Sequence, residues 1–389
     1  MVIKPLSENE IMGICIVTEE AIPPVQRFSL TQRIAETLGS EFEVHLVSVK
    51  SSFKDLPQNV HFHPVEVKGW DLFSLKQRAR ANIKLINQIC HVCRQYEIDL
   101  VYGWWPAVFV GATLARKPFA VDMPEFIDEM YRSFDRPFPK IMRLLLRYLQ
   151  TFVACKSQSV ITESDIATDE WAKRKVHRDK LYCAPYGIEV EVFQSASANG
   201  IRPKYGIPED RILVMYHGDI GSDDGVDLLI RAVKRLDVWC LIAGSGPIRY
   251  INYLKSLANE RTIFTGWVPY PQIPSLLATA DIYVAPFRST LYTNTTYPLK
   301  QMEAMAAGKA TICSDLKAFS KSVREGYDIK LIKASDLDEL TSAIRELAEN
   351  EEERKRLGHN ARKTASEKFD WKIRARKEVQ MLRDIISKL

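Results

Sequence analysis

Residues 295–315 read TTYPLKQMEAMAAGKATICSD, and this stretch predicts a loop, a short helix and a buried strand in succession. Pro298 suits a first helical turn because its φ is fixed and its missing N–H has no partner to lose there. The residues LKQMEAMAA are mostly strong helix formers, and Gly308 suits the left-handed position just past a helix end. ATIC is a short apolar run of the kind that a parallel sheet buries. The stretch therefore indicates a helix-to-strand unit of an α/β sheet.

Polar groups in the same stretch have two interpretations. Lys300 and Glu303 are three residues apart, so they share one helix face. With the hydroxyls of Thr295 and Thr296 beside them, they predict a nucleotide site at the helix N-terminus. The ribose would lie on Glu303, and the phosphates near the helix dipole and Lys300. The alternative is a solvated Lys–Glu pair on an ordinary helix, which the local sequence alone favours.

Length and composition indicate a globular, multidomain protein. The 389 residues are 46% hydrophobic and 26% charged, which predicts two or three domains. A net charge of +5, from 54 basic and 49 acidic residues, does not argue for a nucleic-acid partner. The seven cysteines are odd in number and lie mostly in apolar runs, which predicts a reducing compartment, the cytoplasm.

No segment of the sequence predicts a signal peptide or a membrane span. Acidic residues interrupt the first 17 residues before any long apolar core, unlike a secretory signal. The longest uncharged run, residues 100–115, is short for a membrane span and contains Gly103, Pro106 and Gly111.

The first half of the chain alternates between predicted strands and helices. The predicted strands are residues 11–17, 43–49, 99–102, 118–122 and 159–164, and the main predicted helices are residues 29–38 and 74–96. In open α/β sheets, ligands bind beyond the carboxyl ends of the strands. The loop 18–28, Trp104, Trp105 and Asp122 follow such ends, so we expect them to face one crevice, with one of the two tryptophans exposed to it.

Residues 139–154, PKIMRLLLRYLQTFVA, predict a basic amphipathic helix with two interpretations. Such a helix can lie on an anionic membrane, which would make the protein peripheral at the inner membrane face. The alternative, which we favour on sequence, is a helix whose Leu and Ile side chains pack on the sheet. In that case Lys140, Arg143 and Arg147 would lie outside.

The second half repeats the alternation after a small polar segment, QSASANG, at residues 194–200. We therefore predict two doubly wound, Rossmann-like α/β domains, residues 1–193 and 201–370, which face a central cleft. The helix within residues 371–389 is predicted to cross back onto the first domain. Gly244-Ser245-Gly246, between a strand and a helix, is an incomplete phosphate-binding pattern.

Six segments in order resemble the retaining glycosyltransferases of the GT-B architecture, the "family four" group, over nearly the whole chain. The segments are APYGIEVEVF (184–193), YHGDIGSDDGVDLLIRAV (216–233), AGSGP (243–247), FTGWVPYPQIPSLLATADIYVAPF (264–287), PLKQMEAMAAGKATICSD (298–315) and FDW (369–371). Each segment alone is a weak signal, but six in the family's order are specific.

The resemblance implies a nucleotide-sugar donor on the second domain and an acceptor on the first. It implies that Glu303 bonds the ribose, that the backbone near Trp267 and Val268 meets the base, and that Gly218 packs against the diphosphate with Lys300 nearby. The other donor-side residues implied are Asp219, Gly244, Gly246, Thr295, Thr296 and Leu299.

The sequence departs from the family at two cations. The family has an Arg after the first glycine and a Lys before the second, where this chain has Asp219 and Asp224. A charged hydrogen bond contributes about 1.5–3 kcal/mol, so losing two would weaken donor binding roughly 10²–10⁴-fold. Leaving-group stabilisation is the main help this chemistry needs.

Three interpretations of this departure stay open. In the first, Lys300 and Arg288 replace the missing cations and act with Asp122 as the catalytic residues. In the second, Asp219, Asp223 and Asp224 bind a Mg²⁺ that bridges the diphosphate. In the third, sugar transfer is lost. Asp223 and Asp224 also suit the cap and first turn of the following helix.

Two further departures concern the sugar and the acceptor. Thr295 stands where the family often has an acidic residue that contacts the donor sugar. Asp122 stands roughly where many members have a His, so Asp122 and Glu125 are candidate contacts to the reacting hydroxyl, or caps of the next helix.

The leading prediction is a retaining glycosyltransferase that moves a sugar from a nucleotide-diphosphate sugar to a glycan, lipid-linked or small-molecule hydroxyl, with no obligatory metal. The alternatives are a non-catalytic relative acting as a binding or scaffold subunit, and a nucleotide-sugar epimerase or hydrolase. Asp219 and Asp224 favour the non-catalytic relative, whereas the intact residues 298–308 oppose it.

Overall fold

The computed structural model describes residues 12–21, 30–49, 56–67, 75–104, 106–123, 126–130, 139–198 and 200–389. Most of the predicted loop 18–28, Trp105 and Glu125 lie outside the described residues.

The first domain is a seven-stranded parallel sheet with the order β3-β2-β1-β4-β5-β6-β7. Its strands are β1 (Gly13–Ala21), β2 (Glu43–Val49), β3 (Val60–Val65), β4 (Leu100–Trp104), β5 (Phe119–Asp122), β6 (Ser159–Thr162) and β7 (Leu181–Cys183). Its helices are α1 (Leu30–Leu38), α2 (Leu75–Gln95), α3 (Ala107–Ala115), α4 (Ile127–Met130), α5 (Lys140–Lys156) and α6 (Asp165–Lys173). β3 was not predicted, and its Pro64 is compatible with a strand because β3 lies at the sheet edge.

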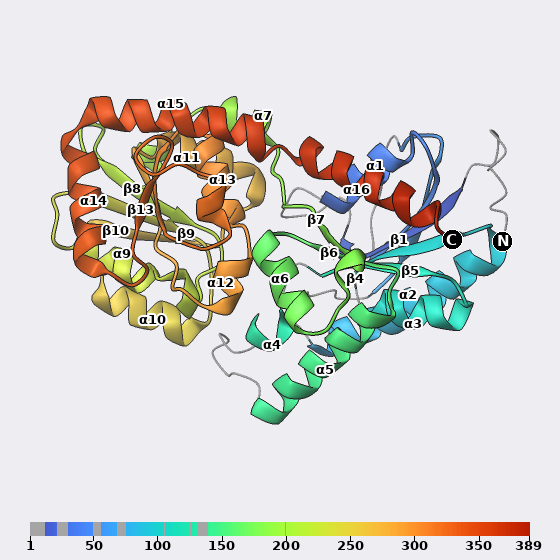
Figure 1. Cartoon of the computed structure of the whole chain (residues 1–389). Helices are drawn as coiled ribbons and strands as arrows, with labels where there is room; N and C mark the ends of the chain where they lie inside the picture. Colours follow the sequence, from blue (N-terminus) through green and yellow to red (C-terminus); the bar gives the residue numbers. More distant parts are fainter. Residues whose placement is uncertain are drawn as a thin grey trace.

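The second domain is a six-stranded parallel sheet with the order β10-β9-β8-β11-β12-β13. Its strands are β8 (Leu213–His217), β9 (Trp239–Ala243), β10 (Thr262–Gly266), β11 (Ile282–Ala285), β12 (Ala310–Ser314) and β13 (Lys330–Ile332). The helices from the crossing onward are α7 (Val190–Gln194), α8 (Ile201–Lys204), α9 (Val226–Val233), α10 (Ile248–Leu257), α11 (Ile273–Thr279), α12 (Leu291–Thr295), α13 (Leu299–Ala306), α14 (Leu337–Glu349), α15 (Glu351–Lys368) and α16 (Trp371–Ile386). The predicted fold class, two doubly wound α/β domains, is confirmed (Figure 1).

The chain crosses between the domains at residues 184–188 and returns at residues 369–371. Ala184 lies in the first-domain core and Ile188 in the second-domain core. The two crossings lie side by side, because the Ile188 N–H donates to the Phe369 carbonyl (2.8 Å) and the Trp371 N–H donates to the Ile188 carbonyl (3.1 Å). The crossing comes earlier than the 194–200 segment suggested by composition, since α7 already packs in the second domain.

After the return, α16 lies on the first domain against α1 (Figure 1). Its Val379, Leu382 and Ile386 share a hydrophobic core with Ile34 and Leu38 of α1. The last helix of the chain therefore joins the first domain, although the second domain separates it in the sequence from β7, which ends at Cys183.

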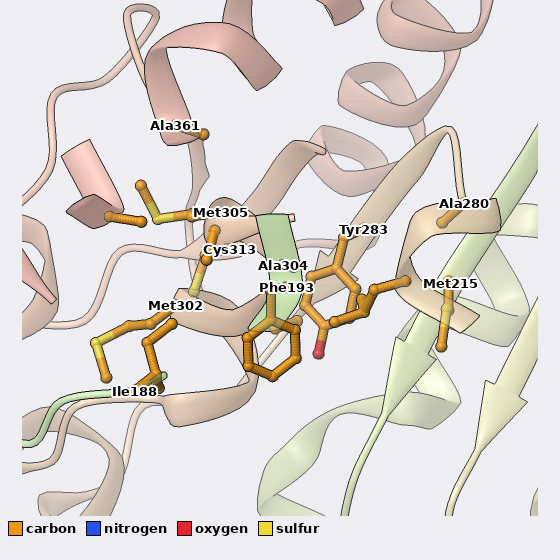
Figure 2. Packing of buried hydrophobic residues seen from close by; sticks show 14 of the residues in the cluster. Ile188, Phe193, Met215, Ala280, Tyr283, Met302, Ala304, Met305, Cys313 and Ala361 are labelled. Carbon is orange, nitrogen blue, oxygen red and sulfur yellow. The ribbon is translucent and has the colours of Figure 1, made fainter. Parts of the chain in front are cut away.

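The α13 helix of the opening stretch is fixed by core packing. Met302, Ala304 and Met305 are buried with Cys313 of β12 and Phe193 of α7, and Figure 2 shows these side chains together. Because the apolar side of α13 is held in this way, its Lys300 and Glu303 are carried at fixed positions beside the ends of β8 and β11.

The α5 helix differs from our preferred sequence interpretation. Its Leu and Ile side chains do not pack on the sheet: Ile141, Leu144 and Leu145 are exposed. The buried positions of α5 are Gln150, Val153 and Ala154. Hydrophobic periodicity identifies an apolar face but does not say whether that face points toward the core.

Candidate functional site

Two glycine-containing loops meet at the carboxyl ends of β8 and β9. Gly218 follows β8 with φ +112°, and Gly244 follows β9; a Cβ at Gly244 would lie 1.8 Å from the Gly218 carbonyl oxygen. A Cβ at Gly246 would lie 2.1 Å from the Ile220 carbonyl oxygen. Glycine is therefore required here by close loop packing. The N–H groups of Gly218 and Ile220 already donate to Ala243 and Ser245, both at 2.9 Å.

Lys300 lies beside Gly218 and is paired. Its Nζ donates to the Tyr216 hydroxyl and to Asp224 Oδ1, both at 2.6 Å, and to the Asp219 carbonyl at 3.2 Å. Asp224 also accepts the Gly221 N–H at 2.8 Å. Burial and then the Asp224 charge raise the pKa of the Tyr216 hydroxyl well above its usual value. Tyr216 therefore stays neutral, and its hydroxyl accepts from Lys300 while it donates to the Asp219 carbonyl at 2.6 Å.

Arg288, in the loop after β11, is also paired. Its guanidinium donates to both oxygens of Asp227, at 2.9 and 2.8 Å, and its Nε donates to the Ser222 carbonyl at 3.0 Å. Asp227 lies in the first turn of α9, three residues after Asp224. Each cation that we expect at the diphosphate thus contacts an aspartate near the start of α9.

Glu303 is buried, with 7% of its surface exposed, and both of its oxygens have partners. His217 Nε2 lies 2.7 Å from Glu303 Oε2, and the Tyr270 hydroxyl donates to Oε1 at 2.8 Å. Each carboxylate oxygen has a second lone pair, so these contacts leave acceptor capacity for a ribose hydroxyl. His217 and Tyr270 were not predicted. A signal for His217 is present in the sequence, because it is a polar residue that ends an otherwise apolar strand.

The other donor-side residues lie in varied surroundings. Trp267, just after β10, keeps 52% of its surface exposed, as a stacking platform for a base requires. Val268 and Leu299 pack against the second-domain core. The buried Thr295 hydroxyl donates to the carbonyls of Leu291 (2.9 Å) and Tyr292 (3.0 Å) within α12. Thr296 and Asp219, respectively half-buried and exposed, flank the site.

A cavity of about 610 Å³, lined mostly by polar residues, lies between the domains. The first domain lines it with Glu129 of α4 and with Ile166 and Glu170 of α6; the second domain contributes Ser222, Asp223, Ser289, Thr290, Leu291, Asn294 and Lys317. The Ser164 hydroxyl donates to the Thr295 carbonyl at 2.6 Å and so joins the two domains at α12. The cavity therefore lies next to the Arg288 loop, and a ligand inside it would contact both domains.

Asp122 occupies the end of β5 as expected, but its carboxylate belongs to a buried charge cluster. Arg374 of α16 donates to Asp122 Oδ2 at 2.8 Å and pairs with Glu378, to which the Tyr102 hydroxyl donates at 3.2 Å. Burial raises the pKa of Asp122 and that of Glu378, the latter to about 7. Asp122 is 8% exposed and is not among the described residues that line the cavity. Trp104, at the end of β4, is half-buried.

Neither a metal-binding cluster nor a membrane span is found among the described residues. Over the described part of the chain, no group of three or more His, Cys, Asp or Glu side chains is placed to hold a metal ion. The same residues include no helix that is long and apolar enough to cross a bilayer. The Mg²⁺ interpretation remains a prediction. It would require the Asp224 carboxylate to bind the ion in place of Lys300.

Comparison with known proteins gives matches in sequence. Residues 198–364 match the family described as glycosyl transferases group 1. The MMP alpha-(1->4)-mannosyltransferase of Mycolicibacterium hassiacum is 25% identical over 327 residues, which cover 81% of this chain and 69% of the relative. The alpha-D-kanosaminyltransferase of Streptomyces kanamyceticus is 23% identical over 60% of this chain and 62% of its own length.

Solved structures share the fold of the whole chain. Sucrose-phosphate synthase from Thermosynechococcus elongatus superposes with a TM-score of 0.78 at 16% identity, over 97% of this chain and 100% of its own. Anabaena HepE, solved in complex with UDP and glucose, has a TM-score of 0.73 at 17% identity, over 96% of this chain and 100% of its own. At these identities the similarity shows the fold alone, and the fold is that of the GT-B glycosyltransferases.

Proposed function

We propose that this chain, whose residues 198–364 match the group 1 glycosyltransferases and whose fold is that of the GT-B glycosyltransferases, moves a sugar from a nucleoside diphosphate sugar to a hydroxyl acceptor and retains the anomeric configuration. The acceptor would be a glycan, a lipid-linked sugar or a small molecule held by the first domain. The observation that carries the proposal is the interdomain cavity of about 610 Å³. It lies beside the Arg288 loop, which belongs to the family-matched residues 198–364. The UDP complex of HepE supports a nucleotide-sugar donor.

In this proposal the second domain holds the donor. The base would lie against Trp267, the ribose on Glu303 and the diphosphate between the Gly218 loop and the N-terminus of α13. His217 and Tyr270 act as positioning residues, since they fix both oxygens of Glu303. A diphosphate beside Gly218 would exchange the Asp224 carboxylate for phosphate oxygens as the partner of Lys300.

Retention requires the acceptor hydroxyl to attack from the face that the diphosphate leaves. Charge then builds on the leaving diphosphate, and cations and dipoles aimed at it supply the main stabilisation. Lys300, Arg288 and the N–H groups at the start of α13 would provide this stabilisation. The exposed fractions of the Lys300 and Arg288 side chains, 18% and 35%, leave both cations open to an incoming ligand.

A second candidate is a non-catalytic relative that kept the fold. Asp219 and Asp224 favour it, because they replace the family's cations, and Asp224 also pairs with Lys300. Such a protein would bind no nucleotide and would consume no nucleotide sugar. An epimerase or hydrolase, in contrast, would consume the donor without an acceptor.

A thermal-shift screen of the purified chain against UDP, GDP, ADP and CMP, each with and without Mg²⁺, tests the proposal. We expect one diphosphate to raise the unfolding temperature, because a ligand that binds only the folded state stabilises it. Glu303→Ala should reduce that shift, and an unchanged shift would refute the ribose assignment. No shift with any nucleotide would favour the non-catalytic relative.

The proposal also places the protein in the cytoplasm, at the inner face of a membrane. All seven cysteines are free thiols, which is usual in a reducing compartment.

A further inference from the structure

The α5 helix carries a continuous exposed apolar stripe. Its members, which we call the α5 face, are Ile141, Leu144, Leu145, Tyr148, Leu149 and Phe152, and their exposed fractions range from 41% to 76%. The spacing i, i+3, i+4, i+7, i+8, i+11 places all six side chains on one side of a helix. A large contiguous apolar patch on a protein surface usually marks a site where another protein or a membrane binds.

The α5 face points away from the rest of the protein. The helix contacts its own domain through Gln150, Val153 and Ala154, which are buried. On a helical projection of about 100° per residue, these three lie on the side opposite Ile141 and Tyr148. At the C-terminal end of the face, the Phe152 ring lies edge-to-face with Phe109 of α3, with ring centroids 6.0 Å apart. The rest of the larger apolar side is exposed, while the narrower side of the helix packs.

The charges around the α5 face select the kind of partner. The helix contains Lys140, Arg143, Arg147 and Lys156 and no acidic residue. Lys140 and Arg147 border one edge of the stripe, Lys156 lies at its C-terminal end, and all three are exposed. We propose that the α5 face docks on an anionic phospholipid bilayer, with the helix in the plane of the interface, its apolar side chains among the acyl chains and its basic side chains on the headgroups.

A second copy of the chain fits this face less well. Two α5 faces brought together would place Lys140, Arg147 and Lys156 of each copy next to like charges, and neither helix offers an acidic partner. An anionic bilayer neutralises the same residues. Tyr148, which is 69% exposed within the stripe, has the amphipathic ring that is enriched at the membrane interface.

The docking surface lies near the proposed active site. The α5 helix packs on α4 (Figure 1). Glu129 of α4 lines the interdomain cavity. Docking through the α5 face would therefore bring the cavity close to the lipid headgroups. On the proposed function, this arrangement favours an acceptor attached to a lipid.

Vesicle co-sedimentation of the full chain, without nucleotide or acceptor, tests the docking surface. We expect binding to phosphatidylcholine vesicles that contain phosphatidylglycerol and at least about tenfold weaker binding to phosphatidylcholine alone. The double variant I141E/L145E should lose about tenfold or more of the anionic-vesicle binding, since it places two carboxylates in the stripe. The matched control is Ile248→Glu on α10, which changes a 70% exposed side chain of the other domain and should leave binding unchanged.

A second variant distinguishes a loss of docking from a loss of folding. K140Q/R147Q keeps the apolar stripe and should weaken binding to anionic vesicles selectively, with an unchanged circular dichroism spectrum. Equal sedimentation of the wild type with both vesicle types, or of I141E/L145E with the wild type, would overturn the proposal. So would a dimer in light scattering that I141E/L145E converts to a monomer, with no vesicle binding by the wild type. Because no substrate is present, none of these outcomes depends on the proposed transfer activity.

Discussion

Two groups of paired charges in this molecule use the same residue types in different surroundings. The donor-side pairs are Lys300–Asp224 and Arg288–Asp227 in the second domain, and the anchor cluster is Arg374 with Asp122 and Glu378 in the first. The side chains of Lys300 and Asp224 keep 18% and 16% of their surface exposed, whereas those of Arg374 and Glu378 keep 0%.

This difference determines what each group can do. An ion pair in contact with water contributes up to about 1 kcal/mol and can exchange partners, whereas removing one member of a buried pair costs about 3–5 kcal/mol. The donor-side cations are therefore available to a phosphate. The anchor cluster instead joins α16 to β5, so Asp122, although it ends a strand of the sheet, fits a structural role better than a catalytic one.

The strongest test of the comparison is Arg374→Met. This variant leaves two carboxylates buried without their cation, so we expect the free energy of unfolding in urea to fall by about 3–5 kcal/mol. The matched control is Arg383→Met on the same helix, whose partner Glu41 is partly exposed and whose loss should cost less than about 1 kcal/mol. Equal losses in the two variants would remove the distinction between the groups.

A pH titration of stability tests the anchor cluster in a second way. Burial raises the pKa of Glu378 from 4.5 to about 7, despite the nearby Arg374. The folded state therefore binds more protons than the unfolded state between these values, and this contribution to stability is present below pH 4.5 and lost as the pH rises through 7. The loss amounts to at most about 3 kcal/mol.

Glu378→Gln isolates this contribution. Burial lowers the pKa of His45 from 6.5 to about 4, which gives a contribution of opposite sign over an overlapping pH range. The difference in unfolding free energy between wild type and Glu378→Gln cancels the His45 contribution. It should change steadily between pH 5 and 7.5. A difference that stays constant across this range would show that Glu378 does not hold a proton in the folded state.

On the donor side, Lys300→Ala tests whether the partly exposed cation serves the nucleotide. We expect the affinity for the preferred nucleoside diphosphate to fall about 10–100-fold, which corresponds to one charged hydrogen bond of about 1.5–3 kcal/mol. Stability should change little. Arg235→Ala, which breaks an exposed pair with Asp338 in the same domain, is the control and should leave affinity unchanged. An unaltered affinity in Lys300→Ala would make the Lys300–Asp224 pair purely structural.

Much of the fold could be predicted from the sequence because buried parallel strands are short apolar runs bounded by helices. The first-domain helices at residues 30–38 and 75–95 fall within a residue of the prediction. The crossing between the domains could not be predicted in the same way. The polar residues 194–200 resemble a linker, but Val190 and Phe193 just before them already pack in the second-domain core.

The candidate site was predictable only in part. The spacing of Lys300 and Glu303 placed both on one helix, as the structure shows. Their partners come from other strands and loops: Asp224 is 76 residues from Lys300, and His217 is 86 residues from Glu303. Local sequence therefore identified the charged groups but not their pairing, which depends on how the sheet brings β8, β11 and α13 together.

The central claim is that a bound diphosphate replaces the Asp224 carboxylate as the partner of Lys300. Calorimetric titration of Asp224→Asn with nucleoside diphosphate tests this claim most directly. The asparagine keeps the size of the side chain and an oxygen for the Gly221 N–H, but removes the competing charge. We predict that the variant binds the preferred nucleoside diphosphate up to about tenfold more tightly than the wild type, with or without Mg²⁺. Weaker binding, above all in Mg²⁺, would contradict the claim and would identify Asp224 as a ligand of a bridging metal.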